Sequence, residues 1–280
     1  MSTKKSFANT ESTKALICFD FDETYFPHAC EKRQLEDLHA MELYLDQIAR
    51  EYRVKIAWVT GSDCDALAAK IERAHLTYMP HFIAANLGTE LYQITANGEW
   101  KEIYAWKQHL PDQEAFNRLV EGLIQKLFLD GIALQPQTMH GQSPYKKNYY
   151  YFPNENDLAD VMYRIREAAA AVKVGLNMNA CNPLAGDPDG AYDVDFIPLR
   201  TGKRAAVQFL VNHCMVEPTQ VYAFGDSGND LEMLQYAEHG FLVANATEEV
   251  KRKYSQVCDT SYAAGIQSTL QQFFKMKANK

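Results

Sequence analysis

Two acidic segments, each directly after an apolar run, hold the side chains best suited to chemistry. Asp20-Phe-Asp-Glu-Thr24 follows the run that begins at Ala15, and Asp226-Ser-Gly-Asn-Asp230 follows a run that begins at Gln220. Such runs predict buried strands of a parallel sheet, and ligands bind at the carboxyl edge of these sheets. Clustered carboxylates repel unless a cation lies among them, and hard oxygen ligands without a His or Cys cluster favour Mg²⁺. The alternative for each segment alone is an ordinary surface turn.

Two further positions suggest a site for an anion. Thr60, Gly61 and Ser62 end a third apolar run before a helix, where backbone N–H groups and hydroxyls can donate to an anion. The alternative there is a simple helix cap. Lys203 begins another helix, where a cation opposes the helix dipole unless an anion compensates it. The alternative for Lys203 is a solvated surface lysine.

Together these four segments suit phosphoryl transfer. An aspartate carboxylate can attack phosphorus, while a hydroxyl, backbone amides, a lysine and Mg²⁺ spread the developing charge. A second aspartate two residues on can protonate the leaving oxygen and then activate water to hydrolyse the aspartyl-phosphate.

The elements that would position these residues alternate between strands and helices. Short apolar strands are expected over 15–21, 54–60, 82–85, 220–224 and 240–244, and helices over 31–50, 63–74, 202–211, 230–238, from 247 and over 262–276. This alternation predicts an α/β fold with a doubly wound parallel sheet. The stretch from about 90 to 196 has its own strand–helix–strand units, so we expect it to be an inserted α+β domain. The expected boundaries are 1–88 and 197–280 for the core and 89–196 for the insertion.

Composition narrows the class of partner. The chain has 280 residues, 47% of them hydrophobic, and a net charge of -8, which disfavours a nucleic-acid backbone or an anionic membrane surface as ligand. Residues 1–13 are polar and resemble no signal peptide, and no run reaches the about 18 apolar residues of a membrane helix. Six scattered cysteines without a C-x-x-C pair favour reduced thiols, and hence a cytoplasmic protein.

In order, the four segments resemble the four motifs of the haloacid dehalogenase-like phosphatase superfamily, and the insertion resembles its type IIB cap. The resemblance implies a Rossmann-like core in which Asp20 is the nucleophile and Asp22 the general acid/base. It implies that Thr60, Gly61, Ser62 and Lys203 bind the phosphoryl group.

The same resemblance implies a Mg²⁺ site. The metal would be held by the Asp20 carboxylate, the Asp22 backbone carbonyl and Asp226. Asn229 and Asp230 would orient Lys203 and metal-bound water.

Segments that extend beyond the four motifs, most of them in or next to the insertion, narrow the resemblance. Leu87-Gly-Thr-Glu90 and Tyr145-Lys-Lys-Asn-Tyr149 are similar to sucrose-phosphate phosphatases. Phe21–His28, Asn182–Asp187 and Tyr192–Pro198 are similar to the kanosamine-6-phosphate phosphatases of bacilli. This similarity implies hydrolysis of kanosamine 6-phosphate, a 3-amino-3-deoxyglucose 6-phosphate, to kanosamine, within antibiotic biosynthesis. Alternatives are another hexose 6-phosphate, sucrose 6-phosphate, or a non-catalytic sugar-phosphate sensor, although such a sensor would be expected to lack Asp20, Asp22 or Lys203.

Candidates for contact with the sugar share polar side chains near the insertion: Glu90, Lys146, Asn148, Asn182 and Asp187. Each has a structural alternative, such as an ion pair, a solvent-exposed strand position or a turn. Asp193 and Asp195 alternate on one strand face and could either contact the sugar or brace the hinge. The expected partner is a small sugar phosphate, while the sequence leaves the oligomeric state open.

Overall fold

The computed structural model describes residues 4–137, 143–154, 158–183 and 186–275. The chain divides into two compact units. We term Met1–Ile103 with Lys203–Lys280 the core unit, and Tyr104–Gly202 the inserted unit. The chain thus leaves the core unit once and returns to it.

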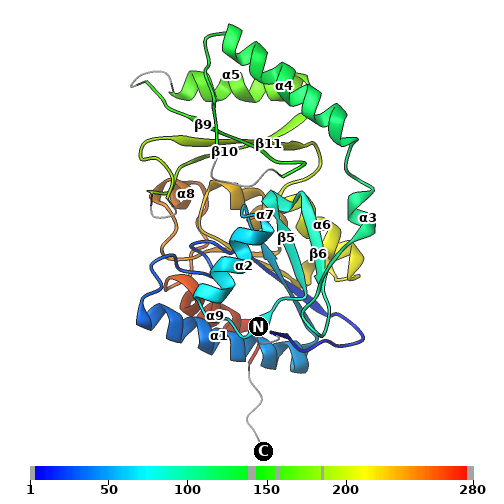
Figure 1. Ribbon diagram of the computed structural model, residues 1–280. Helices are drawn as coiled ribbons and strands as arrows, with labels where there is room; N and C mark the ends of the chain where they lie inside the picture. The colour runs from blue at the N-terminus through cyan, green and yellow to red at the C-terminus, as the bar shows by residue number, and fades with distance from the viewer. Residues whose placement is uncertain (1–3, 138–142, 155–157, 184–185, 276–280) are drawn as a thin grey trace, which may run out of the picture. The chain divides into compact units, whose positions relative to one another are not determined.

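A seven-stranded sheet forms the centre of the core unit (Figure 1). In spatial order its strands are β13 (His239–Leu242), β12 (Val221–Gly225), β2 (Ala15–Phe19), β3 (Val54–Val59), β5 (Phe82–Ala85), β6 (Glu90–Ile94) and β7 (Trp100–Glu102). The first five are parallel, and β6 and β7 continue the sheet antiparallel to β5. The predicted α/β fold with a parallel central sheet is confirmed.

Helices cover both faces of this sheet. One face packs against α1 (Lys32–Tyr52), α2 (Cys64–Arg73) and α9 (Tyr262–Phe273), and α1 lies beside α9 (Figure 1). Short connections and the remaining helices complete the unit: η1 (Asn86–Gly88), α6 (Lys203–His213), η3 (Pro218–Gln220), η4 (Gly228–Asp230), α7 (Leu231–Tyr236) and α8 (Glu248–Lys253). Every residue of β2, β3 and β12 is buried, so these strands show apolar runs, interrupted in β3 by Lys55, rather than alternating patterns.

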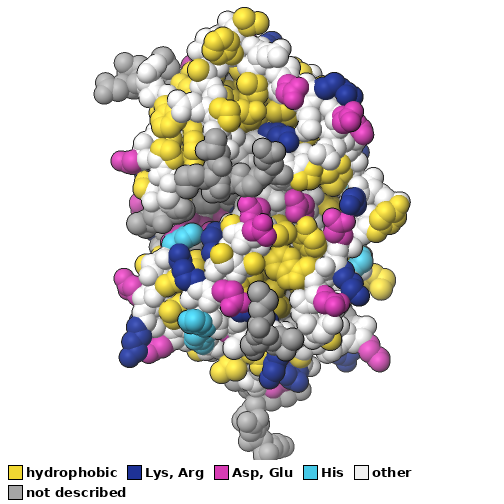
Figure 2. Space-filling model, viewed as in Figure 1, with side chains coloured by type: hydrophobic (Ala, Val, Ile, Leu, Met, Phe, Trp, Pro, Cys, Tyr) yellow, Lys and Arg dark blue, Asp and Glu magenta, His cyan; other side chains and the backbone are white. Residues whose placement is uncertain are grey.

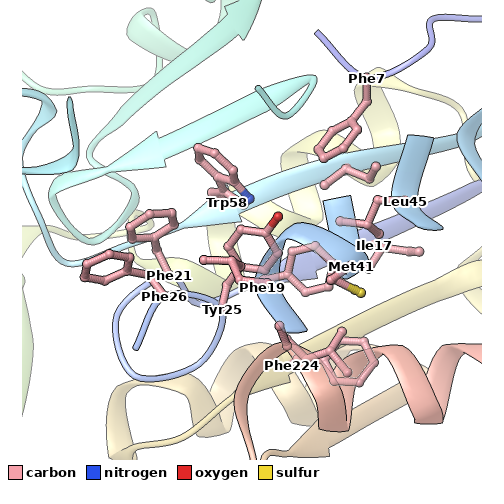
Figure 3. Close-up of a cluster of buried hydrophobic side chains, with 14 of the residues drawn as sticks. Phe7, Ile17, Phe19, Phe21, Tyr25, Phe26, Met41, Leu45, Trp58 and Phe224 are labelled. Carbon is pink, nitrogen blue, oxygen red and sulfur yellow. The ribbon is translucent and has the colours of Figure 1, made fainter. Parts of the chain in front are cut away.

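An aromatic cluster lies directly beneath the loop that follows β2. The rings of Phe21 and Phe26 stack with centroids 5.4 Å apart, and Phe21 and Tyr25 both contact Trp58 on β3 (Figure 3). All four side chains are fully buried. Phe21, Tyr25 and Phe26 therefore fix the course of the loop that carries Asp20 and Asp22.

A small parallel pairing holds the N-terminal segment to the core unit. β1 (Lys5–Ser6) pairs with β4 (Tyr78–Met79), a contact that the sequence analysis does not predict. Buried His81 fixes this region because its Nδ1 accepts from the Ile56 N–H at 3.0 Å and its Nε2 donates to the Ala8 carbonyl at 3.1 Å. Burial and the nearby Lys55 charge lower the pKa of His81 to about 3.

The inserted unit has a sheet and a core of its own. Its antiparallel sheet has the order β10 (Val174–Ala180), β11 (Tyr192–Pro198), β9 (Lys147–Tyr151) and β8 (Gln135–Pro136). The helices of this unit are α3 (Tyr104–Lys107), α4 (Gln113–Leu129) and α5 (Leu158–Ala171), and α4 and α5 pack on one face of the sheet through an apolar cluster (Figure 1).

The division between the units differs from the expected boundaries. β6 and β7 belong to the core sheet, although the sequence analysis assigns residues from 89 onward to the insertion. The chain reverses at η1, where Leu87 has φ 58°, and forms a hairpin on β5. At the other end, the expected boundary at 196/197 falls inside β11. Short strands show the same local pattern whichever sheet they join, so the pattern alone does not assign them.

Charged side chains of both signs are interspersed over the face drawn in Figure 2. Among the described residues, no helix combines the length and apolar character needed to cross a membrane.

Candidate active site

Neighbouring strands bring the two acidic segments together. β2 and β12 pair in parallel, so Asp20 and Asp226, which follow their last residues, lie at the same edge of the sheet. The Asp20 N–H donates to the Phe224 carbonyl at 2.9 Å. Carboxylate oxygens of Asp20, Asp226 and Asp230 all lie within 4.8 Å of one another. A Cβ atom on Gly225 would overlap the Asp230 side chain, which explains glycine at the end of β12.

Lys203 bridges two of these carboxylates. Its Nζ lies 2.5 Å from Asp20 Oδ1 and 2.7 Å from Asp230 Oδ1, and all three side chains are buried. Burial alone would lower the pKa of Lys203, but the charges of Asp20 and Asp230 raise it above its ordinary value. Lys203 therefore stays charged beside the predicted nucleophile.

Asp230 positions its neighbours. Its Oδ2 accepts from the backbone N–H groups of Asp226 at 3.0 Å and Ser227 at 3.1 Å, while Oδ1 accepts from Lys203. Both oxygens are thus engaged by the protein, which supports the predicted role of Asp230 in orienting Lys203.

Asp20 and Asp226 carry negative charge that Lys203 only partly offsets. Burial, followed by the charge of Asp230, raises the pKa of Asp20 to about 7 against the effect of Lys203. Burial and the charges of Asp20 and Asp230 raise the pKa of Asp226 well above its ordinary value. Thr24 donates to Asp226 Oδ1 at 3.0 Å and orients it. Paired carboxylates in this state fit a hard divalent cation, which would relieve their repulsion.

The Asp22 side chain points to a different set of partners. Its Oδ2 accepts from Thr60 Oγ1 at 3.1 Å and Ser62 Oγ at 2.8 Å. Its Oδ1 accepts from His28 Nε2 at 3.1 Å and from Lys70 Nζ. Burial alone would raise the pKa of Asp22, but the His28 hydrogen bond and the Lys70 charge outweigh it and hold that pKa well below its usual range.

Glu23 holds the loop between Asp22 and His28 in place. It adopts φ 58°, and its carboxylate accepts from the His28 N–H at 2.9 Å and the Tyr262 hydroxyl at 2.8 Å. Its carbonyl accepts from Asn245 Nδ2 at 2.6 Å. Segments near the C-terminus therefore fix the loop after the predicted nucleophile.

The residues predicted to contact the sugar do not share one unit. Glu90 begins β6 in the core unit, where its carboxylate accepts from Asn86 Nδ2 at 2.8 Å and Tyr92 OH at 2.9 Å. Its placement in the insertion is therefore wrong, because the η1 reversal keeps it on the core sheet. The other four candidates, Lys146, Asn148, Asn182 and Asp187, all lie in the inserted unit.

One face of the inserted sheet is polar across neighbouring strands. Asp195 pairs with Asn148 and Asp193 with Tyr150, so these four side chains share a face. Further polar contacts extend it: Tyr150 OH to Asp187 at 2.9 Å, Gln137 Nε2 to Asp193 at 2.7 Å, Asn177 Nδ2 to Asp195 at 3.0 Å and Lys146 Nζ to Asp195 at 3.9 Å. We call this set the polar sheet face. Asn182 follows β10 in a turn, where its carbonyl accepts from the Asp187 N–H at 3.4 Å.

Known proteins match nearly the whole chain. The family model for sucrose-6F-phosphate phosphohydrolase matches residues 13–273. The kanosamine-6-phosphate phosphatase of Bacillus subtilis is 38% identical over 270 residues, which cover 95% of each chain. The chain belongs to the sucrose-6F-phosphate phosphohydrolase family.

Solved structures place this family member among the haloacid dehalogenase-like hydrolases. The hydrolase yhjK of Bacillus subtilis matches with a TM-score of 0.76 and 35% identity, covering 99% of this chain and 97% of that one. The sucrose-phosphatase of Synechocystis, solved with sucrose and phosphate, has a TM-score of 0.69 and 22% identity, covering 93% and 98%, and shares the fold. The expected superfamily is confirmed, and the chain is a phosphoric monoester hydrolase.

The sequence analysis of this phosphohydrolase misses Lys70. The residue lies three positions after buried Leu67 and one before buried Ile71 on α2. Helical periodicity thus puts Lys70 at the border of the buried helix face, and this position is the feature of the sequence that could have indicated its role. Glu23 and Tyr262 were also missed, because their contact joins positions 239 residues apart.

Proposed function

We propose that this chain hydrolyses a sugar phosphate through an aspartyl-phosphate on Asp20. The observation that carries the proposal is the buried Asp20 carboxylate, held against Lys203 and beside Asp226 at the edge of the sheet. A carboxylate oxygen of Asp20 attacks phosphorus, and the bond from phosphorus to the sugar oxygen breaks with its electron pair on that oxygen. Asp22 donates a proton to the departing oxygen.

The second half of the cycle restores Asp20. Asp22 takes a proton from water, which attacks phosphorus and releases inorganic phosphate. The contacts of His28 and Lys70 with Asp22 favour its ionised form, so Asp22 has to bind a proton before it acts as the acid of the first half. Lys203 and the backbone at Gly61 would bind the phosphoryl oxygens, and Thr60 and Ser62 would join them by turning donors that in this structure serve Asp22 and Thr60 toward the phosphoryl group.

A Mg²⁺ ion is the cofactor that the donor set suits. The carboxylates of Asp20 and Asp226, with the backbone carbonyl of Asp22, would hold it. The loop around them is held by Asp230, which accepts from two backbone N–H groups, and by Asn229 Oδ1, which accepts from the Ser227 hydroxyl at 3.1 Å. When bound, the ion supplies positive charge to the transferring phosphoryl group.

Kanosamine 6-phosphate is the substrate we propose. A relative that is 38% identical over 95% of both chains is named for that substrate. The polar sheet face adds a physical reason, because Asp187, Asp193 and Asp195 lie together there, and burial with the two neighbouring charges raises the pKa of Asp193 to about 6. An ammonium group would relieve this repulsion, whereas a neutral sugar hydroxyl would not. Sucrose 6-phosphate is the second candidate, because it is the substrate named by the matching family model.

A substrate panel tests the proposal. Phosphate release is measured with Mg²⁺ for kanosamine 6-phosphate, glucose 6-phosphate and sucrose 6-phosphate, with Asp20→Asn as the blank. We expect the highest kcat/KM for kanosamine 6-phosphate. Equal values for the two hexose phosphates would remove the amino-sugar specificity, and no release from any of the three would refute the sugar-phosphatase function.

We also propose that the protein lies in the cytoplasm and acts on a small molecule. All six cysteines are free thiols, which fits a reducing cytoplasm. The proposed ligand is a small molecule, rather than nucleic acid or a membrane.

A further inference from the structure

The carboxylate of Asp22 is held at both oxygens. Thr60 and Ser62, from the predicted phosphate-binding segment, donate to Oδ2. Oδ1 faces two groups outside the four motifs, His28 Nε2 at 3.1 Å and Lys70 Nζ. Hydrogen bonds to a single oxygen would let the carboxylate turn about its Cβ–Cγ bond, whereas contacts at both oxygens fix its plane.

Lys70 reaches both sides of this arrangement. Besides contacting Asp22 Oδ1, its ammonium donates to Ser62 Oγ at 2.7 Å, and that hydroxyl donates to Asp22 Oδ2. The Lys70 side chain is 19% exposed and that of Asp22 is 24% exposed. The pair is therefore shielded from much of the solvent that weakens surface ion pairs.

Helix α2 gives Lys70 a fixed base. Asp63 caps the helix by accepting from the Ala66 N–H at 2.7 Å. Near its end, Arg73 donates to the His28 carbonyl at 2.6 Å and lies over the Phe26 ring at 4.9 Å. Arg73 thus contacts the same loop as Lys70, but its described contacts do not include Asp22. It provides a matched control.

We propose that Lys70 is a positioning residue that aims the Asp22 carboxyl at the leaving oxygen of the substrate. The inference rests on the proposed function, because it assigns Lys70 to the proton-transfer step of that reaction. Without Lys70, Oδ1 keeps only His28, and Ser62 loses the donor that orients its hydroxyl. Because loss of the ammonium also removes a charge that favours the ionised carboxylate, a fall in activity reports misplacement of Asp22 and not a change in its pKa.

The dependence of kcat/KM on the leaving group distinguishes positioning of Asp22 from binding of the phosphoryl group. A sugar alkoxide needs a proton as it leaves, whereas p-nitrophenolate leaves without one. Because kcat/KM covers only the steps up to departure of the leaving group, it does not include the later activation of water. Lys70→Met, Lys70→Arg and Arg73→Met are therefore compared on the best hexose 6-phosphate of the panel and on p-nitrophenyl phosphate.

We expect Lys70→Met to lower kcat/KM for the hexose phosphate about 100-fold, at the lower end of general acid–base contributions, and to change the p-nitrophenyl phosphate value far less. Lys70→Arg should recover part of the loss. Arg73→Met should stay within about twofold on both substrates, as for other surface substitutions.

Other outcomes would overturn the inference. Equal losses on both substrates, with weaker inhibition by inorganic phosphate, would make Lys70 a phosphoryl-binding residue. Unchanged kinetics in Lys70→Met would show that it has no role. If Lys70→Met does not fold, Lys70→Gln replaces it, and equal losses on both substrates would again contradict positioning. Asp20→Asn separates the two proposals: full activity in that variant sinks the proposed function, whereas a failure confined to the Lys70 variants sinks only this inference.

Discussion

At the scale of the residue, the site is a balance of few charges. Lys203 neutralises part of the charge of Asp20 and Asp230, and Asp226 has Thr24 as its described side-chain donor. The repulsion that raises the pKa of Asp226 is a cost to the folded chain that a bound cation would remove.

Removing that repulsion should stabilise the metal-free protein. We expect Asp226→Asn to melt at a higher temperature than the wild type in EDTA, because a like charge is lost. Mg²⁺ should raise the melting temperature of the wild type but not that of the variant. At a Mg²⁺ concentration 100 times its Kd, the free energy of unfolding of the wild type should rise by about 2.7 kcal/mol. An equal response of both proteins to Mg²⁺ would place the metal elsewhere.

Asp193 should decide the preference for an amino sugar. We expect Asp193→Asn to lower kcat/KM for kanosamine 6-phosphate about 30-fold, or about 2 kcal/mol for a hydrogen bond between charged groups. The value for glucose 6-phosphate should change little. Exposed Asp189, in the neighbouring turn, gives the control Asp189→Asn. Equal losses on both sugars in Asp193→Asn would mean that Asp193 supports the sheet rather than reads the amine.

At the scale of the element, the ends of the strands position the acidic residues of the candidate site, and contacts from the loops orient their side chains. The carboxyl ends of β2 and β12 were predictable because continuous apolar runs meet acidic residues there. The pairing order of the strands was not, because β6 and β7 look locally like strands of the insertion. The β1–β4 pairing escaped prediction because two-residue strands carry no period.

The contacts around the loop that carries Asp20 and Asp22 could not be predicted from sequence patterns either. Lys70 reaches Asp22 across 48 positions, and Tyr262 reaches Glu23 across 239. Resemblance supplied the motif residues, but it did not supply the groups that hold them. Such partners depend on the sheet order and on which helix face turns toward the loop.

His81, which links the N-terminal segment to β3, should make the free energy of unfolding fall in acid. Its pKa is about 3 in the folded protein and 6.5 ordinarily, so the unfolded chain binds more protons between these values. Stability from this group is full above about pH 6.5 and is lost as the pH falls toward 3. Relative to His81→Asn, the wild type should lose about 2 kcal/mol of unfolding free energy between pH 7.5 and 5.

Urea unfolding at several pH values measures this difference. The variant His75→Asn, at an exposed histidine, serves as the control and should follow the wild type. Parallel pH profiles for the wild type and His81→Asn would show that His81 is not the titrating group.

At the scale of the whole molecule, the inserted unit interrupts the chain of the core unit. The core unit holds the motif residues and Glu90, and the inserted unit holds the polar sheet face. A net charge of -8 is compatible with binding a phosphate ester, because buried Lys203 supplies positive charge locally and the proposed cation at Asp20 and Asp226 would add to it.

The central claim is that Asp20 carries the phosphoryl group during turnover. The most direct measurement mixes enzyme, Mg²⁺ and excess substrate, quenches in acid within one turnover and maps the peptides by mass spectrometry. The account predicts one phosphoryl group on the peptide containing Asp20, absent from Asp20→Asn. A phosphoryl group on another residue, or phosphate release by Asp20→Asn at the wild-type rate, would contradict it.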